Sequence, residues 1–295
     1  MTLSLFILTR IISNPLSNVF QKKLTNLSTI SPLFIIFITH FLLSLVCLPI
    51  FLIMPPVYLS GQFLGYILIC AVLAVTGNTL IVAALKSADL SVLGPINAYK
   101  SIVSLLPGIL ILGEFPTRFG ITGILLILAG SFFIMDKVPN QQQADAFRQF
   151  WKNPGIRLRF AALVVSATEA IFLKKAVQAS SPLVAFLFWC MLGVPVAGLV
   201  LMVWGRQALR DDAARLLQHR VMLVLLAITT GLMQAATLFT FNIMQVGYSL
   251  ALFQTSTILS VLFGYGFFQE KNIPRRLVGA IIMVAGAALI ITFGS

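Results

Sequence analysis

The chain has 295 residues, of which 59% are hydrophobic and only 9% are charged. In soluble domains about a quarter of the residues are charged, so a water-soluble fold could not hide this much apolar surface. The formal net charge of +12 does not indicate a nucleic-acid partner, because the Lys and Arg residues lie in short segments between apolar runs rather than along one face. We therefore expect an all-α membrane protein surrounded by a lipid bilayer.

Apolar runs bounded by Pro, Gly, Asn or charged residues predict ten transmembrane helices. Each crossing takes about 20 apolar residues, and lipid offers no partner for unpaired backbone groups. The first run is expected to be a membrane helix rather than a cleaved signal peptide, since Lys22 and Lys23 follow it instead of preceding it. The predicted helices span residues 3–21, 31–54, 63–85, 91–112, 118–135, 159–178, 182–204, 219–242, 248–268 and 274–293.

The longest connection separates two predicted halves. Its apolar side chains, such as Phe147 and Trp151, fall on one helical face opposite charged ones such as Arg148. This pattern favours a helix lying in the headgroup layer over a solvated linker. We expect a first five-helix unit at 1–135, a basic amphipathic linker at 136–158 and a second five-helix unit at 159–295.

The two halves repeat one another in sequence. The end of the first helix, FQKK at 20–23, matches FLKK at 172–175. Five helices per half is an odd number, so the halves would lie in the membrane in opposite orientations, as in secondary transporters with a site near the midplane. Laying 78–134 over 234–290 also aligns small and acidic residues: Ser104 with Ser260, Gly108 with Gly264, Glu114 with Glu270, Gly123 with Gly279 and Gly130 with Gly286.

Three segments make the chain resemble the EamA-type permeases of the drug/metabolite transporter superfamily. They are AALKSADLSVLGPINAYKSIVSLLPGILILGEFPT at 83–117, GITGILLILAG at 120–130 and FGYGFFQEKNIPRRLVGAIIMVAGAALI at 263–290. The resemblance covers essentially the whole chain and is nearly silent on the substrate. It implies a ten-helix basket in which helices 1, 3, 4, 6, 8 and 9 line a central cavity, while helices 2, 5, 7 and 10 brace it.

Three ionisable residues, Arg10, Lys100 and Glu169, fall near the middle of predicted helices. A charge at this depth costs a few kcal/mol, so each is expected to face a cavity or a partner and is a candidate for substrate binding or coupling. Two alternatives stay open. Arg10 could extend to the membrane surface, and Lys100 and Glu169 could simply neutralise each other.

Uncharged polar residues accompany these three on the predicted cavity helices. On helix 4 they form a stripe at helical spacing that includes Lys100. Some of the amides could instead serve only to join adjacent helices. The further candidates for the cavity are Asn14 and Ser17 in helix 1, Asn78 in helix 3, Asn97, Ser101 and Ser104 in helix 4, Gln234 in helix 8, and Gln254 and Thr257 in helix 9.

Other polar and small residues are assigned to packing or to solvent. His40 lies in a bracing helix, and Glu114 ends helix 4 before a polar loop, where a solvated acid is expected. The glycines of helices 5 and 10 would let these helices approach their neighbours, or each other, closely. The sequence contains no paired membrane carboxylates, Ser/His/Asp set, HExxH or phosphate loop, and its cysteines lack metal spacing. We expect neither an enzyme nor a cofactor or metal.

These features favour a secondary transporter that moves a small polar metabolite across a bacterial inner membrane by alternating access. Export is the expected direction, and protons are a candidate coupling ion. Two cations against one acid leave the expected cavity net positive, which suits a carboxylate-bearing substrate such as an amino acid or an organic acid. The alternatives are a multidrug or cation exporter with Glu169 as its proton site, and a non-transporting membrane scaffold. Either a monomer or a homodimer is compatible with the sequence.

The orientation in the membrane follows from the charge pattern. Ten helices would put both termini on one side, and the resemblance implies that this side is the cytoplasm. Most of the 20 Lys and Arg residues, however, fall in connections on the opposite side. The positive-inside rule places that side in the cytoplasm. The charge pattern therefore predicts periplasmic termini, against the resemblance.

Overall fold

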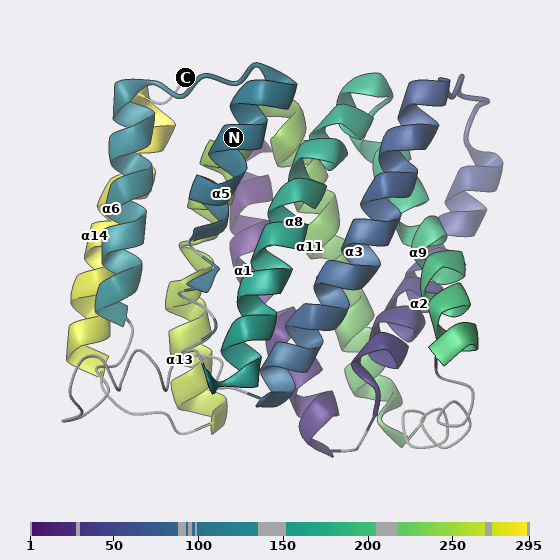
Figure 1. Cartoon of the computed structure of the whole chain (residues 1–295), viewed down its shortest axis with the longest axis horizontal. Coiled ribbons are helices and arrows are strands. Elements are labelled where there is room, and N and C mark those ends of the chain that lie inside the picture. The colour runs from purple at the N-terminus through teal and green to yellow at the C-terminus, as the bar shows by residue number, and fades with distance from the viewer. Residues whose placement is uncertain are drawn as a thin grey trace.

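The structure is a computed structural model that describes residues 2–27, 30–87, 93, 96, 97, 99–134, 152–204, 218–268 and 273–293. Within these ranges the secondary structure is helical and includes no strand (Figure 1). The elements are α1 (Thr2–Leu27), α2 (Pro32–Ile53), α3 (Gly61–Ser87), α5 (Tyr99–Pro107), η1 (Gly108–Leu112), α6 (Arg118–Ile134), α8 (Pro154–Ala179), α9 (Pro182–Trp204), α11 (Arg220–Ile243), α12 (Val246–Phe253), α13 (Ser256–Phe268) and α14 (Ile273–Phe293).

Helix α8 begins earlier than the sequence analysis predicted. Pro154 stands in its first turn, where the missing N–H of proline is not needed. The side chain of Asn153 accepts a hydrogen bond from the backbone N–H of Gly155 at 2.8 Å and so caps the helix. Residues 154–158, which were expected in the linker, therefore belong to α8. The predicted amphipathic helix lies outside the described residues, because 135–151 are not described.

Two predicted helices depart from a regular, continuous α-helix. The fourth consists of α5 followed by the π-helical turn η1, and it ends at Gly113, whose φ of 69° lies in the left-handed region that favours glycine. The ninth, predicted at 248–268, breaks between α12 and α13. At this break the side chain of Thr255 donates a hydrogen bond to the carbonyl oxygen of Leu252 at 2.7 Å. Such side-chain bonds compete with the hydrogen bonds of the helix backbone.

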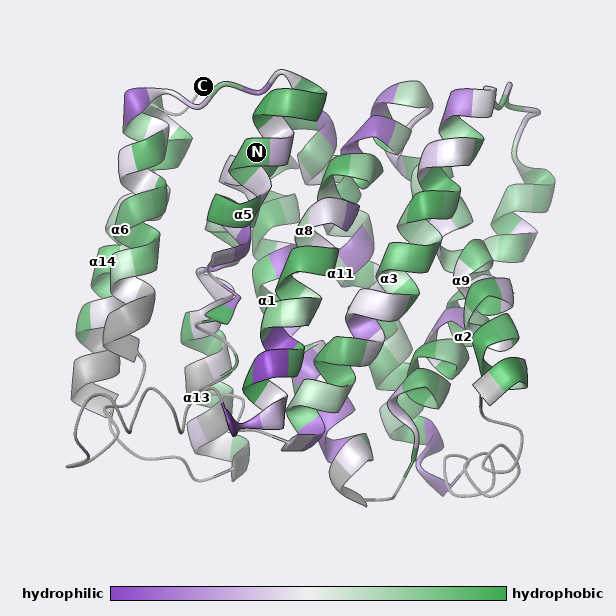
Figure 2. Cartoon of the chain, in the orientation of Figure 1, coloured by the Kyte–Doolittle hydropathy of each residue, from purple (hydrophilic) through white to green (hydrophobic). Residues whose placement is uncertain are grey.

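The bundle has the exterior of a membrane protein. Within the part of the chain that the structure describes, six candidate spans are long and apolar enough to cross a bilayer: α1, α2, α3, α9, α11 and the α12–α13 pair. Shorter apolar helices lie at Tyr99–Leu112, Arg118–Gly130 and Ile281–Phe293. Figure 2 shows hydrophobic residues over most of the helix surfaces, with fewer hydrophilic residues, which lie near the helix ends and within the bundle. Large side chains such as Leu110 and Val203 remain exposed, which suits contact with hydrocarbon rather than water. The chain is therefore a multi-pass membrane protein.

The two halves make equivalent contacts with each other. Helix α1 packs on α11 as α8 packs on α3, while α2 pairs with α9 and α6 with α14. Helices α1 and α8 run in opposite directions. Val19, late in α1, belongs to the same hydrophobic cluster as Ile156, early in α8, whereas Ile7 shares a cluster with Ala176, near the end of α8. The first and last described residues lie at the same end of the bundle (Figure 1).

Glycines bring α6 and α14 into direct backbone contact, which is one of the two arrangements left open by the sequence. A Cβ atom added at Gly123 would lie 2.8 Å from the carbonyl oxygen of Gly286, and one added at Gly130 would lie 2.6 Å from that of Gly279. A larger residue would separate the helices. This pair stands at one side of the bundle (Figure 1), away from the central helices that hold the site.

Candidate functional site

A cavity of about 90 Å³ lies inside the bundle, between α1, α2, α3, α5, α8, α9, α11 and α12. This volume has room for several water molecules. It is well below the 300–1,000 Å³ typical of pockets for drug-sized ligands. Leu173, Phe241 and Leu250 form its apolar end, and the rest of its wall is mostly polar.

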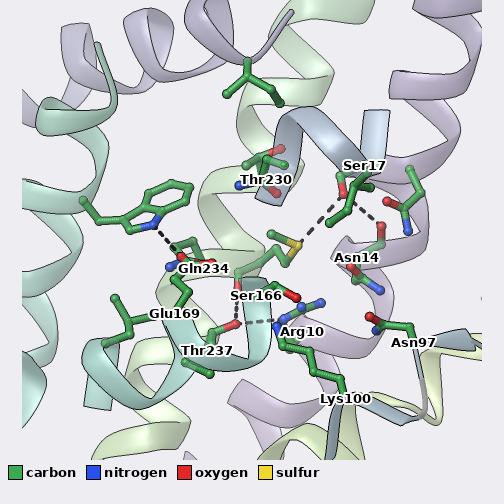
Figure 3. A pocket seen from close by; sticks show the side chains of 18 of the residues that line it. Arg10, Asn14, Ser17, Asn97, Lys100, Ser166, Glu169, Thr230, Gln234 and Thr237 are labelled. Atoms are coloured by element: carbon green, nitrogen blue, oxygen red, sulfur yellow. Dashed lines mark hydrogen bonds between the residues drawn. The ribbon is translucent and has the colours of Figure 1, made fainter. Parts of the chain in front are cut away.

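Most of the candidate residues from the sequence come together in this cavity (Figure 3). Ser104 instead donates to the carbonyl oxygen of Ser101 in its own helix at 2.8 Å. Gln254 accepts a hydrogen bond from Asn97 at 3.1 Å and donates one to Thr257 at 2.8 Å. Ser101, Ser104, Gln254 and Thr257 are thus buried between helices and do not line the cavity. The candidates that do line it are Arg10, Asn14, Ser17, Asn78, Asn97, Lys100, Glu169 and Gln234.

Arg10 points into the cavity rather than toward the membrane surface. Its Nε donates a hydrogen bond to the hydroxyl of Thr237 at 2.8 Å, and its guanidinium carbon lies 5.1 Å from the ring centre of Phe253. Its Nη1 is buried and has no partner among the described residues. The side chain is therefore fixed by α11 and α12, while part of its hydrogen-bonding capacity remains available to a ligand (Figure 3).

Glu169 and Lys100 face the same cavity without touching. Oxygen Oε1 of Glu169 accepts a hydrogen bond from the indole Nε1 of Trp189 at 3.2 Å. Lys100 experiences the negative charge of Glu169. Within the described ranges, however, no carboxylate oxygen lies within 4.0 Å of the Lys100 ammonium. The two residues therefore do not form the direct ion pair that the sequence left open.

Arg159 is a cavity residue that the sequence analysis missed. It was counted as a loop charge, because the predicted helix began at residue 159. The side chain is only 7% exposed and lines the cavity, and its Nε donates to the carbonyl oxygen of Leu93 at 3.2 Å. The signal that could have found it is the Asn153–Pro154 pair, a helix-start pattern. Starting the helix there places Arg159 in the second turn.

Two further cavity residues, His40 and Trp189, come from α2 and α9, which the resemblance had assigned to bracing. Their ring centres are 4.5 Å apart. The His40 Nδ1 lies 3.3 Å from the carbonyl oxygen of Cys190. A Cβ atom added at Gly193 would collide with the His40 ring, so this glycine is what allows α2 to approach α9. The seam between these helices therefore forms part of the cavity wall.

Several buried polar atoms in the cavity wall have no hydrogen-bond partner among the described residues. They are the Nη1 of Arg10, the Oε1 of Gln21, the Oγ1 of Thr230 and the Nε2 of Gln234. An unpartnered buried polar atom costs free energy, so native structures rarely keep one without water or a ligand nearby. Water or a ligand could complete the hydrogen bonds of these four atoms.

Equivalent positions of the two halves line the cavity with different chemistry. Asn14 and Ser17 of α1 correspond to Ser166 and Glu169 of α8, following the FQKK and FLKK match, and all four are cavity residues. Asn78 of α3 corresponds to Gln234 of α11 in the overlay of 78–134 on 234–290, and both line the cavity. The repeat thus places cavity residues at equivalent positions of both halves. The carboxylate of Glu169, however, has an uncharged counterpart, Ser17, in the first half.

A second charged cluster lies beyond the apolar end of the cavity, and we call Glu114, Lys174 and the backbone they bind the junction. Glu114 Oε2 accepts a hydrogen bond from the first N–H of α12, that of Val246, at 2.7 Å. Lys174 Nζ lies 3.7 Å from Glu114 Oε1 and donates to the carbonyl oxygens of Phe241 and Met244 at the end of α11. Each charge thus meets the helix end of opposite polarity.

The sequence analysis was therefore wrong to treat Glu114 as a solvated acid, because its side chain is only 13% exposed. Burial raises the pKa of Glu114 above its ordinary value, although the N–H of Val246 and the ammonium of Lys174 favour the charged form. Next to it, the hydroxyl of Tyr248 accepts a hydrogen bond from the N–H of Thr117 at 2.6 Å. The junction thus ties the loop before α6 to α8, α11 and α12.

The apolar helices, the repeated halves and the enclosed polar cavity together define a multi-pass membrane transporter. The chain belongs to the EamA-like transporter family, which its sequence matches over residues 2–136 and 153–292, and thus to the drug/metabolite transporter superfamily. No curated protein matches the chain. A solved structure, described only as the crystal structure of a protein, has a TM-score of 0.64 and 13% identity over 98% of this chain and 96% of that chain. At this identity the likeness shows the fold alone.

Proposed function

We propose that this protein is a secondary transporter that exports a small, carboxylate-bearing metabolite across the inner membrane. The observation that carries the proposal is the pair of cations Arg10 and Lys100, which face the cavity without a carboxylate in contact among the described residues. A buried charge without a partner is unfavourable, and an anionic substrate would supply one. The unpartnered amide nitrogen of Gln234 adds a further donor for the same negative group.

Alternating access is the proposed mechanism, carried by ten membrane segments in two inverted five-helix repeats. The opposite directions of α1 and α8 and the paired contacts between the halves support this plan. The junction would close the end of the cavity beyond Leu173 and Phe241. Opening would require that Lys174 and Glu114 release the ends of α11 and α12, while the opposite end of the cavity closes.

A cation exporter that uses Glu169 as its proton site is the second candidate, because this carboxylate also faces the cavity without a cation in contact among the described residues. The excess of cations in the wall and the small cavity favour the anion transporter. A scaffold would have no use for charges held apart in a buried cavity, since apolar residues would be more stable there.

Flux into proteoliposomes tests the proposal. Radiolabelled amino acids and organic acids should be transported by the wild type. Lys100→Met should lower this flux about tenfold at low substrate concentration, because the loss of one charge-assisted contact costs about 1.4 kcal/mol. Lys86→Met removes the same charge from an exposed position at the end of α3 and should leave the flux unchanged. Transport of organic cations alone, improved by Lys100→Met, would contradict the proposal.

The periplasmic location of both termini remains part of the proposal, on the strength of the Lys and Arg distribution. Arg159, counted among the loop charges on the cytoplasmic side, is buried, and so is Lys174 on the other side. The bias therefore keeps its direction. A C-terminal alkaline phosphatase fusion should be active and a green fluorescent protein fusion dark. The reverse pair of results would place the termini in the cytoplasm.

A further inference from the structure

The cavity holds more positive charge than a carboxylate-bearing substrate needs. Arg10, Lys100 and Arg159 line it, and Glu169 is the sole acid in its described wall. If all four are charged, two positive charges remain without compensation. A cavity surrounded by apolar helices has a low dielectric constant, so uncompensated charge is far more costly there than in water.

Lys100 is the cation that lies near both of the others. It is close enough to interact electrostatically with Arg10 and with Arg159, and Glu169 is close enough to interact with Arg10 and Lys100. On α8, Arg159 precedes Glu169 by ten positions, a separation of about 15 Å along a helix. Arg159 is therefore at the end of the cavity remote from Glu169, where no described carboxylate lies within 4.0 Å of it.

One hydrogen bond holds Arg159 in place and leaves its other N–H groups available. Its Nε donates to the carbonyl oxygen of Leu93 at 3.2 Å, which fixes the plane of the guanidinium. The remaining N–H groups of the guanidinium form a fork suited to the two oxygens of a carboxylate or phosphate group. A purely structural arginine that anchors Leu93 would need neither contact with the cavity nor a neighbouring cation.

We propose that Arg159, together with Lys100, forms a second anion subsite, so that the preferred substrate is a small dianion. One negative group binds between Arg10 and Lys100, and the other binds between Lys100 and Arg159. A dianion neutralises the excess charge of the wall. A monocarboxylate leaves one positive charge uncompensated, and a zwitterionic amino acid leaves two. This inference rests on the proposed anion transport and narrows its substrate to dicarboxylates or phosphate monoesters.

Binding to the purified, full-length protein tests the subsite. Calorimetric titrations would compare succinate, glycerol 3-phosphate, propionate and alanine. The wild type should bind at least one of the two dianions about tenfold or more tightly than propionate or alanine, a difference of about 1.4 kcal/mol or more, because it makes a second charge-assisted contact. Whichever dianion binds more tightly identifies the second group as carboxylate or phosphate.

Variants of neighbouring arginines separate the subsite from a general effect of charge. Arg159→Gln should weaken binding of the preferred dianion by about tenfold and leave propionate within about twofold. Arg157→Gln removes the same charge two positions earlier, where the side chain is exposed, and should change neither ligand. Arg159→Lys keeps the charge but loses the fork of N–H groups, so it should bind the dianion more tightly than Arg159→Gln and less tightly than the wild type. It also provides a variant for the case that Arg159→Gln does not fold.

The outcomes distinguish the subsite from the proposed function. Equal wild-type binding of propionate and the dianions, or an equal loss of all ligands in Arg159→Gln, would overturn the subsite while leaving anion transport in place. Absence of any anion binding, together with binding of organic cations, would overturn both.

Discussion

The cavity and the junction are two charged regions of one apolar bundle, and they treat their charges in opposite ways. In the junction, Glu114 and Lys174 face each other, and each also binds the helix end of opposite polarity. In the cavity, Arg10, Lys100 and Glu169 line a shared space and are not in ion-pair contact with one another.

This difference separates charges that hold the fold together from charges that the proposed function assigns to a ligand. Buried charges are unfavourable in surroundings of low dielectric constant, so the charges of both regions need compensation. The protein compensates the junction by itself. In the cavity, the proposed function leaves the compensation to water and substrate. Removal of a junction charge should therefore reduce stability first, whereas removal of a cavity charge should reduce transport first.

The largest effect is expected for Lys174→Met. This change leaves the Glu114 carboxylate without its cation and removes the donor of two carbonyl groups at the end of α11. Loss of one partner of a buried ion pair destabilises by about 3–5 kcal/mol. Thermal unfolding in detergent should show a large drop in the midpoint. Lys175→Met, at the next position, serves as control, and an equal drop in both variants would mean that the junction is not specific.

Lys100→Met should reduce transport without reducing stability. The Michaelis constant for an anionic substrate should rise about tenfold or more, because a charge-assisted contact is lost. The thermal midpoint should stay the same or increase, since a buried charge without a contacting carboxylate is replaced by an apolar side chain of similar length. Paired flux and unfolding measurements on one preparation check this. A fall in stability as large as that of Lys174→Met would erase the distinction between the two regions.

Glu169→Gln is expected to act mainly on the pH dependence of transport. The amide oxygen can still accept the hydrogen bond of Trp189, but the side chain can no longer take up or release a proton. The slope of transport rate against pH should flatten, while flux at one fixed pH falls by less than about tenfold, within the range of one lost charge contact. If flux and pH profile both match the wild type, Glu169 has no part in coupling.

The smallest effect is expected for Ser104→Ala. This residue was a candidate from the sequence, yet its hydroxyl bonds only to its own helix and lies outside the cavity wall. Replacement of such a side-chain bond should change stability by less than about 0.5 kcal/mol. Substrate flux should remain within twofold of the wild type, by roughly the same small energy. A large loss of flux would show that the face of α5 that carries Ser104 also contacts the substrate.

The positions of the helices were predicted well where hydrophobicity alone decides them. Most boundaries fall within a few residues, because the length of an apolar run reflects the thickness of the bilayer. The prediction failed at positions that depend on side-chain hydrogen bonds. The break after Phe253 involves Gln254, which accepts a hydrogen bond from Asn97 in the first half of the chain. The early start of α8 depends on Asn153 and Pro154, and this local signal was overlooked.

By itself the sequence determined the membrane class, the repeat, the family and the charges that lie in mid-helix, because composition, periodicity and motifs are local properties. The tertiary structure alone decided which charges are paired. Glu114 and Lys174 are far apart along the chain, and they meet only because α8 and the end of α11 converge at the start of α12. Arg159 and His40 became cavity residues in the same way. Whether a buried charge has a partner depends on how distant segments approach each other, and no single segment carries that information.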